Sequence, residues 1–479
     1  MIIICYEPEP NCTCPLFTRV WDGKMTKLTA YGGTNEIGGN KILLQDGDTK
    51  IFLDFGVSFG AEAEYFGGAI SPRKVNGIGD YLEFGILPRL EGLYAQDEIK
   101  QTGIPSRSPE YQAIIVSHAH ADHVGYVKFL DKAIPVYCGE TSKIILTAQS
   151  ESGSSDLNPS FLRCFRTGDS IKTDNVETKP IHVDHSIPGA YGFIIHTSEG
   201  TIVYTGDLRL HGPAAKMTEE FVEKAAEEHP LILICEGTRV GQKDQHKLGS
   251  EAEVKEAANK VVSTASGLVV ASFYGRDMDR LNTFNSVAMS NDREFVISMK
   301  TALLLTKLQE DKHLKVPDVL HDENILVYKK RKKTGAYQEK DYFKWERPYL
   351  DKAVDHKYIH DHQSKVLMAI EPSNFTELID IRPDAEGDYI YSMSEPHSEL
   401  EEVDEEIQAN WLKHYGMELH QIHASGHAPQ DDIAKIIERI KPKILVPVHT
   451  EFQDKFIHLL KKESPRILIL EKSKTVPLP

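Results

Sequence analysis

The segment His118–His123 places three histidines and an aspartate within six positions, one residue after the apolar run Ala113–Val116. The apolar run predicts a buried strand, and alternate residues of an extended chain share one face, so His118 and His120 can bind the same ion. A helix after the turn presents the aspartate and the last histidine to a second ion. These ligands suit zinc, and two-metal sites hold their ions about 3.5–4 Å apart. The fold must therefore bring further ligands to this strand end.

Three such residues follow other strand-like runs. His185 lies in the segment Ile181–Ala190, Asp207 comes shortly after a run that ends at Tyr204, and His449 comes directly after a run that ends at Val448. Taken alone, a strand-end His or Asp is more often a turn cap or a satisfied polar group. Asp207, however, aims a carboxylate at a sheet edge, where open α/β sheets commonly bind ligands.

Apolar runs alternate with helical periodicity along most of the 479 residues, which indicates α/β layering. The runs Lys41–Leu44 and Lys50–Gly56 flank an Asp-Gly turn and predict a hairpin. After Glu236 the helices become longer and the strands stay short, which predicts a separate parallel-sheet domain. Residues 57–111 show no clean periodicity, and we expect irregular structure there, with a lid over a site as one use for it.

The charge balance restricts the partners. With 55 Lys and Arg against 72 Asp and Glu, the net charge is −17, which argues against non-specific binding to nucleic acid because counterion release needs clustered cations. A local basic groove stays open. The basic run Lys329–Lys333 is more often a solvated loop, and a patch that follows phosphates is the minority interpretation.

The sequence predicts a cytoplasmic protein with no membrane partner. No apolar run approaches the roughly 20 residues that a bilayer requires, and the first residues lack the core of a signal peptide. Six cysteines are too few for a disulfide framework of the secreted kind in a chain of this length.

The motif His-x-His-x-Asp-His, in a chain with a strand-end aspartate upstream and His and Asp residues downstream, resembles the metallo-β-lactamase superfamily. The family's fold is an αβ/βα sandwich with a dinuclear zinc site. The resemblance implies that Asp207 bridges both metals and that Asp54 orients a ligand. The remaining ligands that it implies are His118, His120 and His185 for one metal, and Asp122, His123 and His449 for the other.

Beyond these ligands the resemblance narrows to the β-CASP nucleases. Glu236 in Cys235–Thr238 matches their first extra acidic motif, and His427 and His449 match their later histidine motifs. The implied fold is α/β, a metallo-β-lactamase sandwich with an inserted Rossmann-like parallel-sheet domain. The implied domains are residues 1–235 for the first part of the sandwich, 236–418 for the β-CASP domain and 419–479 for the returning part.

Three further segments, Gly32–Asn40, His423–His427 and Pro447–Glu451, look like the ribonuclease J group and its archaeal relatives. Bacterial members continue into a C-terminal domain used in oligomer contacts, whereas this sequence ends 30 residues after His449. The short archaeal form is therefore the closer analogue, and a homodimer stays open.

The resemblance also implies roles for residues around the metals. Glu236 orients His427, which protonates the leaving oxygen, and Asp122 helps to position water. Two strand-to-helix turns are expected to contact the phosphates of the substrate, although ordinary strand-to-helix connections stay open for both. The residues of these turns are Gly275, Arg276 and Asp277 in the first, and His423, Ala424, Ser425, Gly426 and His427 in the second.

The sequence thus predicts a zinc-dependent ribonuclease that acts on single-stranded RNA, 5′ to 3′ on 5′-monophosphorylated ends, with endonuclease activity left open. The alternatives are a DNA-directed β-CASP nuclease, a small-molecule hydrolase of the thioesterase or lactonase type, and an inactive scaffold subunit. His449 favours RNA, because DNA-directed members tend to lack the last histidine. Two zinc ions are the expected cofactors, and manganese stays open because ligand type does not separate these metals.

Overall fold

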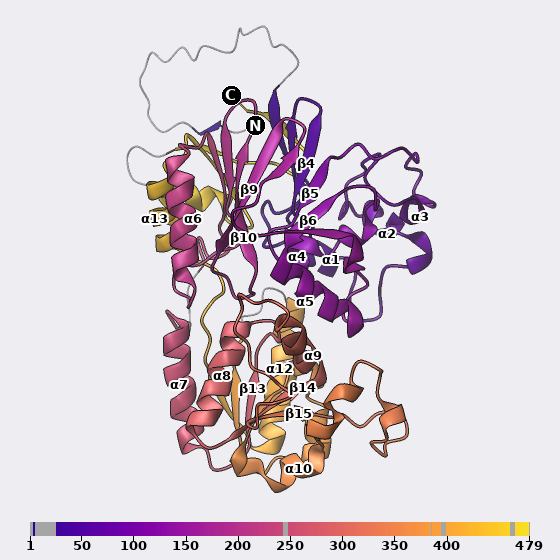
Figure 1. Ribbon diagram of the computed structural model, residues 1–479, viewed down its shortest axis with the longest axis vertical. Helices are drawn as coiled ribbons and strands as arrows, with labels where there is room; N and C mark the ends of the chain where they lie inside the picture. The colour runs from indigo at the N-terminus through magenta and orange to yellow at the C-terminus, as the bar shows by residue number, and fades with distance from the viewer. Residues whose placement is uncertain are drawn as a thin grey trace.

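The computed structural model describes residues 3–4, 25–242, 248–384, 386–393, 399–459 and 465–478. Within these ranges the strands form three sheets, and Figure 1 shows two parts of the molecule stacked along its long axis. The upper part in Figure 1 holds two sheets, and the lower part holds the third. The mixed α/β architecture with a separate parallel sheet, which the sequence predicts, is confirmed.

The upper part is built from two sheets of mixed strand direction. In spatial order, the strands of the first are β22 (Thr475–Pro477), β2 (Thr26–Ala30), β3 (Ile42–Asp46), β4 (Thr49–Leu53), β5 (Ala113–Ile115), β6 (Val136–Gly139) and β7 (Leu162–Phe165). Those of the second are β1 (Ile3–Ile4), β21 (Arg466–Leu468), β20 (Ile444–Val448), β12 (Ile232–Glu236), β11 (Thr201–Tyr204), β10 (Ala190–His196), β9 (Val176–Val183) and β8 (Ile171–Thr173).

The two sheets pack face to face around one apolar core, to which Leu44, Phe193 and Val446 belong. On the outer face of the second sheet lie α6 (Ala215–Glu227) and α13 (Gln430–Ile440), visible at the left of Figure 1. On the first sheet lies α5 (Glu140–Glu151). The result is the predicted αβ/βα sandwich. The predicted hairpin is also present, since β3 and β4 pair in antiparallel register around Gly47.

The sequence of α13 shows why the helices adhere to the sheets. Its four isoleucines, Ile433, Ile436, Ile437 and Ile440, recur at helical spacing and are all buried, while the opposite face is charged. Each fully buried side chain of this size contributes about 1.5–3 kcal/mol. The helix ends at Ile440, and Lys441 after it adopts a left-handed conformation with φ 53°.

The lower part is a parallel sheet. Its strands in spatial order are β16 (Ala353–Val354), β15 (Ile325–Tyr328), β14 (Glu294–Ser298), β17 (Val366–Ala369), β13 (Val269–Ser272), β18 (Asp388–Tyr391) and β19 (Glu418–Gln421). Its helices are α7 (Glu251–Thr264), α8 (Met278–Ser290), α9 (Met299–Leu308), α10 (His356–Asp361), α11 (Glu377–Ile381) and α12 (Glu399–Tyr415). Because β19 still belongs to this sheet, the chain leaves it a few residues after the predicted boundary at 418.

The carboxyl ends of the parallel strands face the upper part. Residues that end or closely follow β13, β14, β15 and β17 line a cavity of about 820 Å³, among them Tyr274, Ser298 and Glu371. The opposite wall includes Ala121 and Leu146 of the upper part. We call this cavity the interdomain cleft. It lies where α/β sheets commonly bind ligands, beside the carboxyl ends of their strands.

Residues 57–111 are largely irregular, as predicted, but they are anchored rather than loose. They contain three short α-helices and one 3-10 helix, and Ile78, Leu82 and Leu93 are buried in the core. The helices of the upper part not yet named are α1 (Phe59–Ala63), α2 (Gly79–Glu83), α3 (Gln96–Ile99), α4 (Ala121–Val124) and α14 (Phe456–Leu459). In the described ranges, no helix combines the length and apolar character needed to cross a membrane.

Candidate metal centre

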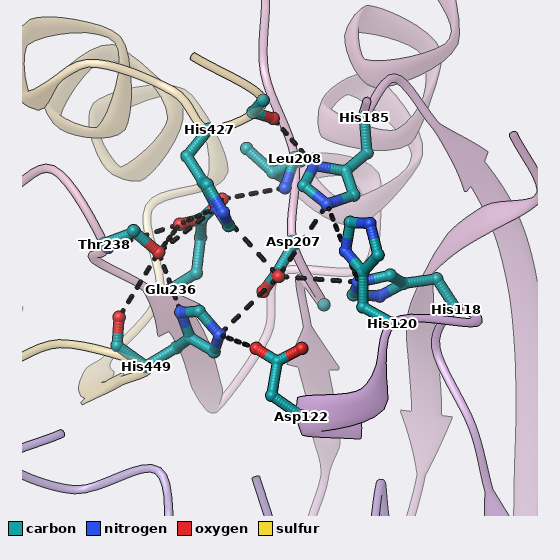
Figure 2. Close-up of polar contacts among 12 residues, drawn as sticks. His118, His120, Asp122, His185, Asp207, Leu208, Glu236, Thr238, His427 and His449 are labelled. Carbon is teal, nitrogen blue, oxygen red and sulfur yellow. Dashed lines mark hydrogen bonds and ion pairs between the residues drawn. The ribbon is translucent and has the colours of Figure 1, made fainter. Parts of the chain in front are cut away.

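Three histidines and one aspartate form a first cluster at the mouth of the sandwich (Figure 2). His120 Nδ1 lies 3.0 Å from His118 Nε2 and 3.2 Å from His185 Nε2. Asp207 Oδ2 lies 3.6 Å from His118 Nε2 and 3.9 Å from His185 Nε2. The nitrogen atoms thus converge on one point together with a carboxylate oxygen, which is an arrangement that suits a borderline divalent cation.

A second cluster shares the same aspartate. His123 Nε2 lies 3.0 Å from Asp207 Oδ2 and 3.6 Å from Asp122 Oδ2. His449 Nε2 lies 3.1 Å from Asp122 Oδ2 and 3.7 Å from Asp207 Oδ2. All seven residues that the sequence predicts as ligands are therefore brought together in two sets, and Asp207 is common to both.

The donor set fits metal ions, and Asp207 gives a specific reason. Its Oδ1 atom is buried and has no hydrogen-bond partner among the described residues. A buried carboxylate oxygen without a partner is costly unless a cation compensates it. Metal ions bind neutral imidazoles and ionised carboxylates, which are the donor groups of these two clusters.

Burial and neighbouring charges set the protonation of the two clusters. Burial lowers the pKa of His118 and His185 well below the usual value and that of His120 to about 3, so these imidazoles are neutral. Burial also opposes a charge on His123, but the carboxylates of Asp207 and Asp122 outweigh it and raise its pKa. The pKa of Asp207 is lowered in return, since His123 and nearby imidazoles outweigh the effect of burial.

The backbone holds α4 in place against the loop after β4. Phe55 N donates to His123 O at 2.8 Å, and Val57 N donates to Ala121 O at 2.9 Å. Gly56 packs directly on this helix, and a Cβ at this position would lie 1.7 Å from Asp122 O. Only glycine fits there, so the Asp-Phe-Gly sequence after β4 determines where the ligands of α4 lie.

Asp54, which the resemblance expects to orient a ligand, lies beside His123. Its carboxylate accepts hydrogen bonds from Ser117 N at 2.6 Å, from Tyr204 Oη at 2.6 Å and from His123 Nδ1 at 2.8 Å. With Nδ1–H used in this way, His123 Nε2 keeps its lone pair for an ion. Ser117 and Tyr204 are functional neighbours that the sequence analysis did not single out.

Thr238 is a third residue that the sequence analysis missed. Its hydroxyl lies 2.7 Å from His449 Nδ1 and 2.8 Å from Glu236 Oε2, to which it donates. His449 itself has a positive φ of 52°, directly after β20, and its N–H donates to Gly33 O at 2.7 Å. The hydroxyl of Thr238 therefore connects the second cluster to the acidic motif. Its position two residues after Glu236 was the only sequence signal.

Replacing Thr238 with valine is expected to weaken zinc binding by about 10–100-fold, since it removes the partner of His449 Nδ1 and keeps the shape of the side chain. Titration with zinc against a competing chelator would measure this. Thr238→Ser, which keeps the hydroxyl, is the matched control and should bind zinc like the wild type. Equal affinities for the valine variant and the wild type would contradict the positioning role of Thr238.

Glu236 and His427 form the predicted pair. His427 Nδ1 lies 3.1 Å from Glu236 Oε2, and Leu208 N donates to Glu236 Oε1 at 2.8 Å. Glu236 is buried, whereas His427 is partly exposed. No described residue is hydrogen-bonded to His427 Nε2.

Comparison with known proteins is consistent with this geometry. A beta-lactamase superfamily domain matches residues 90–245, and a Zn-dependent metallo-hydrolase RNA specificity domain matches residues 416–469. Ribonuclease J 2 of Streptococcus pyogenes serotype M3 is 24% identical over 447 residues, which cover 90% of this chain and 71% of that protein. Ribonuclease J of Mycoplasma pneumoniae is 24% identical over 454 residues, covering 89% and 68%. These matches support an assignment of the chain as similar to ribonuclease J and to the metallo-β-lactamase superfamily.

Ribonuclease J of Helicobacter pylori is also similar, at 23% identity over 441 residues that cover 89% of this chain and 56% of that protein. Among solved structures, a protein of unknown function from Enterococcus faecalis V583 has a TM-score of 0.73 and 23% identity, and the match covers 95% of this chain and all of that one. At this identity the likeness shows the fold. The metallo-hydrolase domain and the His and Asp clusters together support a metal cofactor.

The segment His423–His427 of this ribonuclease J-like chain is held by its carbonyl groups. Arg280 Nη2 donates to Ala424 O at 3.0 Å, His211 Nε2 lies 2.9 Å from Ser425 O, and His185 Nδ1 lies 2.7 Å from Gly426 O. The amide groups of residues 424–426 have no hydrogen-bond partner among the described residues. His423 points elsewhere, with Nδ1 3.2 Å from Ser392 O.

The residues of the other predicted phosphate contact, Gly275–Asp277, lie in two different surroundings. Gly275 and Arg276 line the interdomain cleft. Arg276 has no hydrogen bond or ion pair with any described residue, although its charge acts on His120 and helps to lower the pKa of that imidazole. Asp277, in contrast, caps α8 by accepting a hydrogen bond from Arg280 N at 3.0 Å. Its carboxylate thus has the structural role of a helix cap, which agrees with the ordinary strand-to-helix connection that the sequence left open.

Proposed function

We propose that this protein is a zinc-dependent ribonuclease that hydrolyses phosphodiester bonds of single-stranded RNA at the centre shared by Asp207. The observation that carries the proposal is the arrangement of two ligand clusters around one carboxylate, with the Glu236–His427 pair beside it. Relatives named ribonuclease J match about nine-tenths of the chain, and the RNA specificity domain covers residues 416–469. They point to RNA as the substrate.

Two zinc ions are the proposed cofactors. His118, His120 and His185 would hold one, and Asp122, His123 and His449 would hold the other, with Asp207 between them. Zinc in such a site supplies Lewis acidity and lowers the pKa of water toward neutrality. Asp122, which is partly buried and has its carboxylate 3.1 Å from His449 Nε2, would orient the attacking water by hydrogen bonding.

His427 is the proposed acid. Its Nδ1–H donates to the carboxylate of Glu236, which keeps the ring in one orientation, and Nε2–H can then give a proton to the leaving oxygen. Two partners fix Glu236 in turn, the N–H of Leu208 and the hydroxyl of Thr238. The pair therefore acts as one unit, with His427 as the group that touches the substrate.

Phosphate groups of the substrate have two proposed partners. The amide groups of Ala424, Ser425 and Gly426 are unpaired by the described residues and lie beside His427, so they can donate to a terminal 5′-phosphate. The guanidinium of Arg276 faces the interdomain cleft and can contact a phosphate within the chain. Unpaired amide groups beside the proposed acid would bind a 5′-monophosphate, and on this ground we propose 5′-to-3′ exonuclease action.

The deciding experiment uses one RNA with either a 5′-monophosphate or a 5′-triphosphate, labelled at the 5′ end, and a DNA of the same sequence. We expect the zinc-loaded protein to release labelled mononucleotide only from the monophosphorylated RNA. His120→Ala serves as the inactive control. Internal fragments from both RNAs would show endonuclease action instead of exonuclease action. Faster cleavage of the DNA would show that DNA is the preferred substrate. No cleavage of any strand would refute the proposal.

A further inference from the structure

The basic run Lys329–Lys333 forms part of the wall of the interdomain cleft. The cleft begins beside Ala119 and Ala121, which flank His120, and extends to Lys330 and Lys332. Its charged lining residues comprise four cations, Arg276, Lys300, Lys330 and Lys332, and two anions, Glu346 and Glu371. In a chain with a net charge of −17, this lining carries a local excess of positive charge beside two residues that flank the proposed ligand His120.

An exposed aromatic ring lies within this wall. Phe343 lines the cleft and is 57% exposed, and Trp345 lines it nearby. The ammonium groups of Lys332 and Lys333 lie 5.1 and 5.6 Å from the centroid of the Phe343 ring. Single exposed apolar side chains are common on protein surfaces, but this ring lies in the wall of a cleft beside two cations, where a ligand can reach it.

The buried carboxylate of Glu346 holds this arrangement together. It pairs with Lys332 Nζ, and its other oxygen accepts a hydrogen bond from Phe343 N at 2.9 Å. Behind them, Tyr342 Oη donates to Lys330 O at 3.0 Å. The loop is thus organised before any ligand binds, whereas a merely solvated loop would need none of these contacts.

We propose that Phe343, with Lys332 and Trp345, forms a subsite that stacks an unpaired base of the RNA away from the scissile phosphate. Aromatic rings stack on the face of any base, and neighbouring ammonium groups attract the backbone phosphates. A base in a duplex does not offer its face, so this subsite selects single strands without reading sequence. The inference rests on the proposed ribonuclease function and adds a second point of contact to it.

The test combines a protein variant with a change in the RNA. Short 5′-phosphorylated RNAs, each with one abasic nucleotide at a successive position, are cleaved by the wild type, by Phe343→Ala and by Phe59→Ala. Phe59 is the matched control, since it is 55% exposed and lies outside the cleft lining. We expect Phe343→Ala to raise KM about tenfold with little change in kcat, as loss of one stacked base would do. Phe59→Ala should match the wild type.

The abasic series identifies the base. At one position the abasic RNA should raise KM for the wild type by a similar factor, and should raise it no further for Phe343→Ala, because the same contact is already lost. Phe343→Trp keeps an aromatic face and should retain the sensitivity, which separates stacking from a folding defect. Equal KM values for the two alanine variants, or abasic and Phe343→Ala effects that simply multiply at every position, would overturn the subsite. If the wild type cleaves no RNA at all, it is the proposed function that fails.

Discussion

Replacing Asp207 with asparagine is expected to slow RNA hydrolysis by about 10³-fold or more and to lower the zinc content of the purified protein. The Oδ2 atom of Asp207 lies within 4 Å of imidazole nitrogens from both clusters, namely His118, His123, His185 and His449. Asparagine keeps the shape of the side chain but removes the charge that compensates the second cluster. Elemental analysis and initial rates on one preparation would measure both effects.

A control for this experiment is a buried aspartate that belongs to neither ligand cluster. Asp46 is fully buried and accepts a hydrogen bond from Thr26 Oγ1 at 2.8 Å. Asp46→Asn should lower the melting temperature while zinc content and activity per folded molecule stay at the wild-type level. If Asp207→Asn binds zinc and cleaves RNA as the wild type does, Asp207 is not the shared ligand.

The ligand residues could be predicted from the sequence because their signal is local. The six-residue segment His118–His123 follows a strand and contains most of the predicted metal ligands. Such a density of His and Asp is typical of metal binding. Asp207 and His449 also follow strands, so α/β layering alone brings them to the same sheet edge. The spacing predicts one ion at His118 and His120 and a second at Asp122 and His123, whereas the assignment of His185 and His449 and the sharing of Asp207 came from the family resemblance.

Residues that act through long-range contacts carried no comparable signal. Thr238 contacts His449 across more than two hundred positions, and a single threonine after a strand usually has no such role. Tyr204 contacts Asp54 only because β11 and β4 lie in facing sheets, a pairing that periodicity does not specify. Asp277 has a sequence signal, but the signal is ambiguous. An aspartate directly before a helix such as α8 is compatible with a helix cap and with a substrate contact.

The basic run Lys329–Lys333 shows a further limit. In sequence it is indistinguishable from a solvated loop, because nothing nearby indicates which surface the loop faces. The fold places it after β15, at the carboxyl edge of the parallel sheet, and the upper part of the molecule forms the opposite wall. Its relation to the metal centre thus depends on the packing of two domains, which local patterns do not encode.

The second large effect is expected for His427. Replacing it with asparagine should slow RNA hydrolysis by about 10²–10⁴-fold, the usual contribution of a general acid. Zinc content should stay the same, since His427 Nδ1 bonds to Glu236 at 3.1 Å and lies 4.0 Å from Asp207. His420→Asn is the matched control, because His420 also pairs with a carboxylate but lies on β19, away from the centre. It should retain wild-type rates.

The leaving group separates an acid from a residue that merely positions the substrate. A p-nitrophenyl phosphodiester loses its leaving group as the stable p-nitrophenolate anion, which needs no proton. The loss of a general acid should therefore slow the hydrolysis of this substrate far less than the hydrolysis of RNA. Equal losses on both substrates would show that His427 positions the phosphate instead. A fall in zinc content would make it a ligand, for which its place near Asp207, Glu236 and His449 offers the geometry.

Glu236→Gln then tests the orienting carboxylate. Glutamine can keep the hydrogen bond from Leu208 N but turns an amide group toward His427, so the variant should show the same preference for the activated substrate.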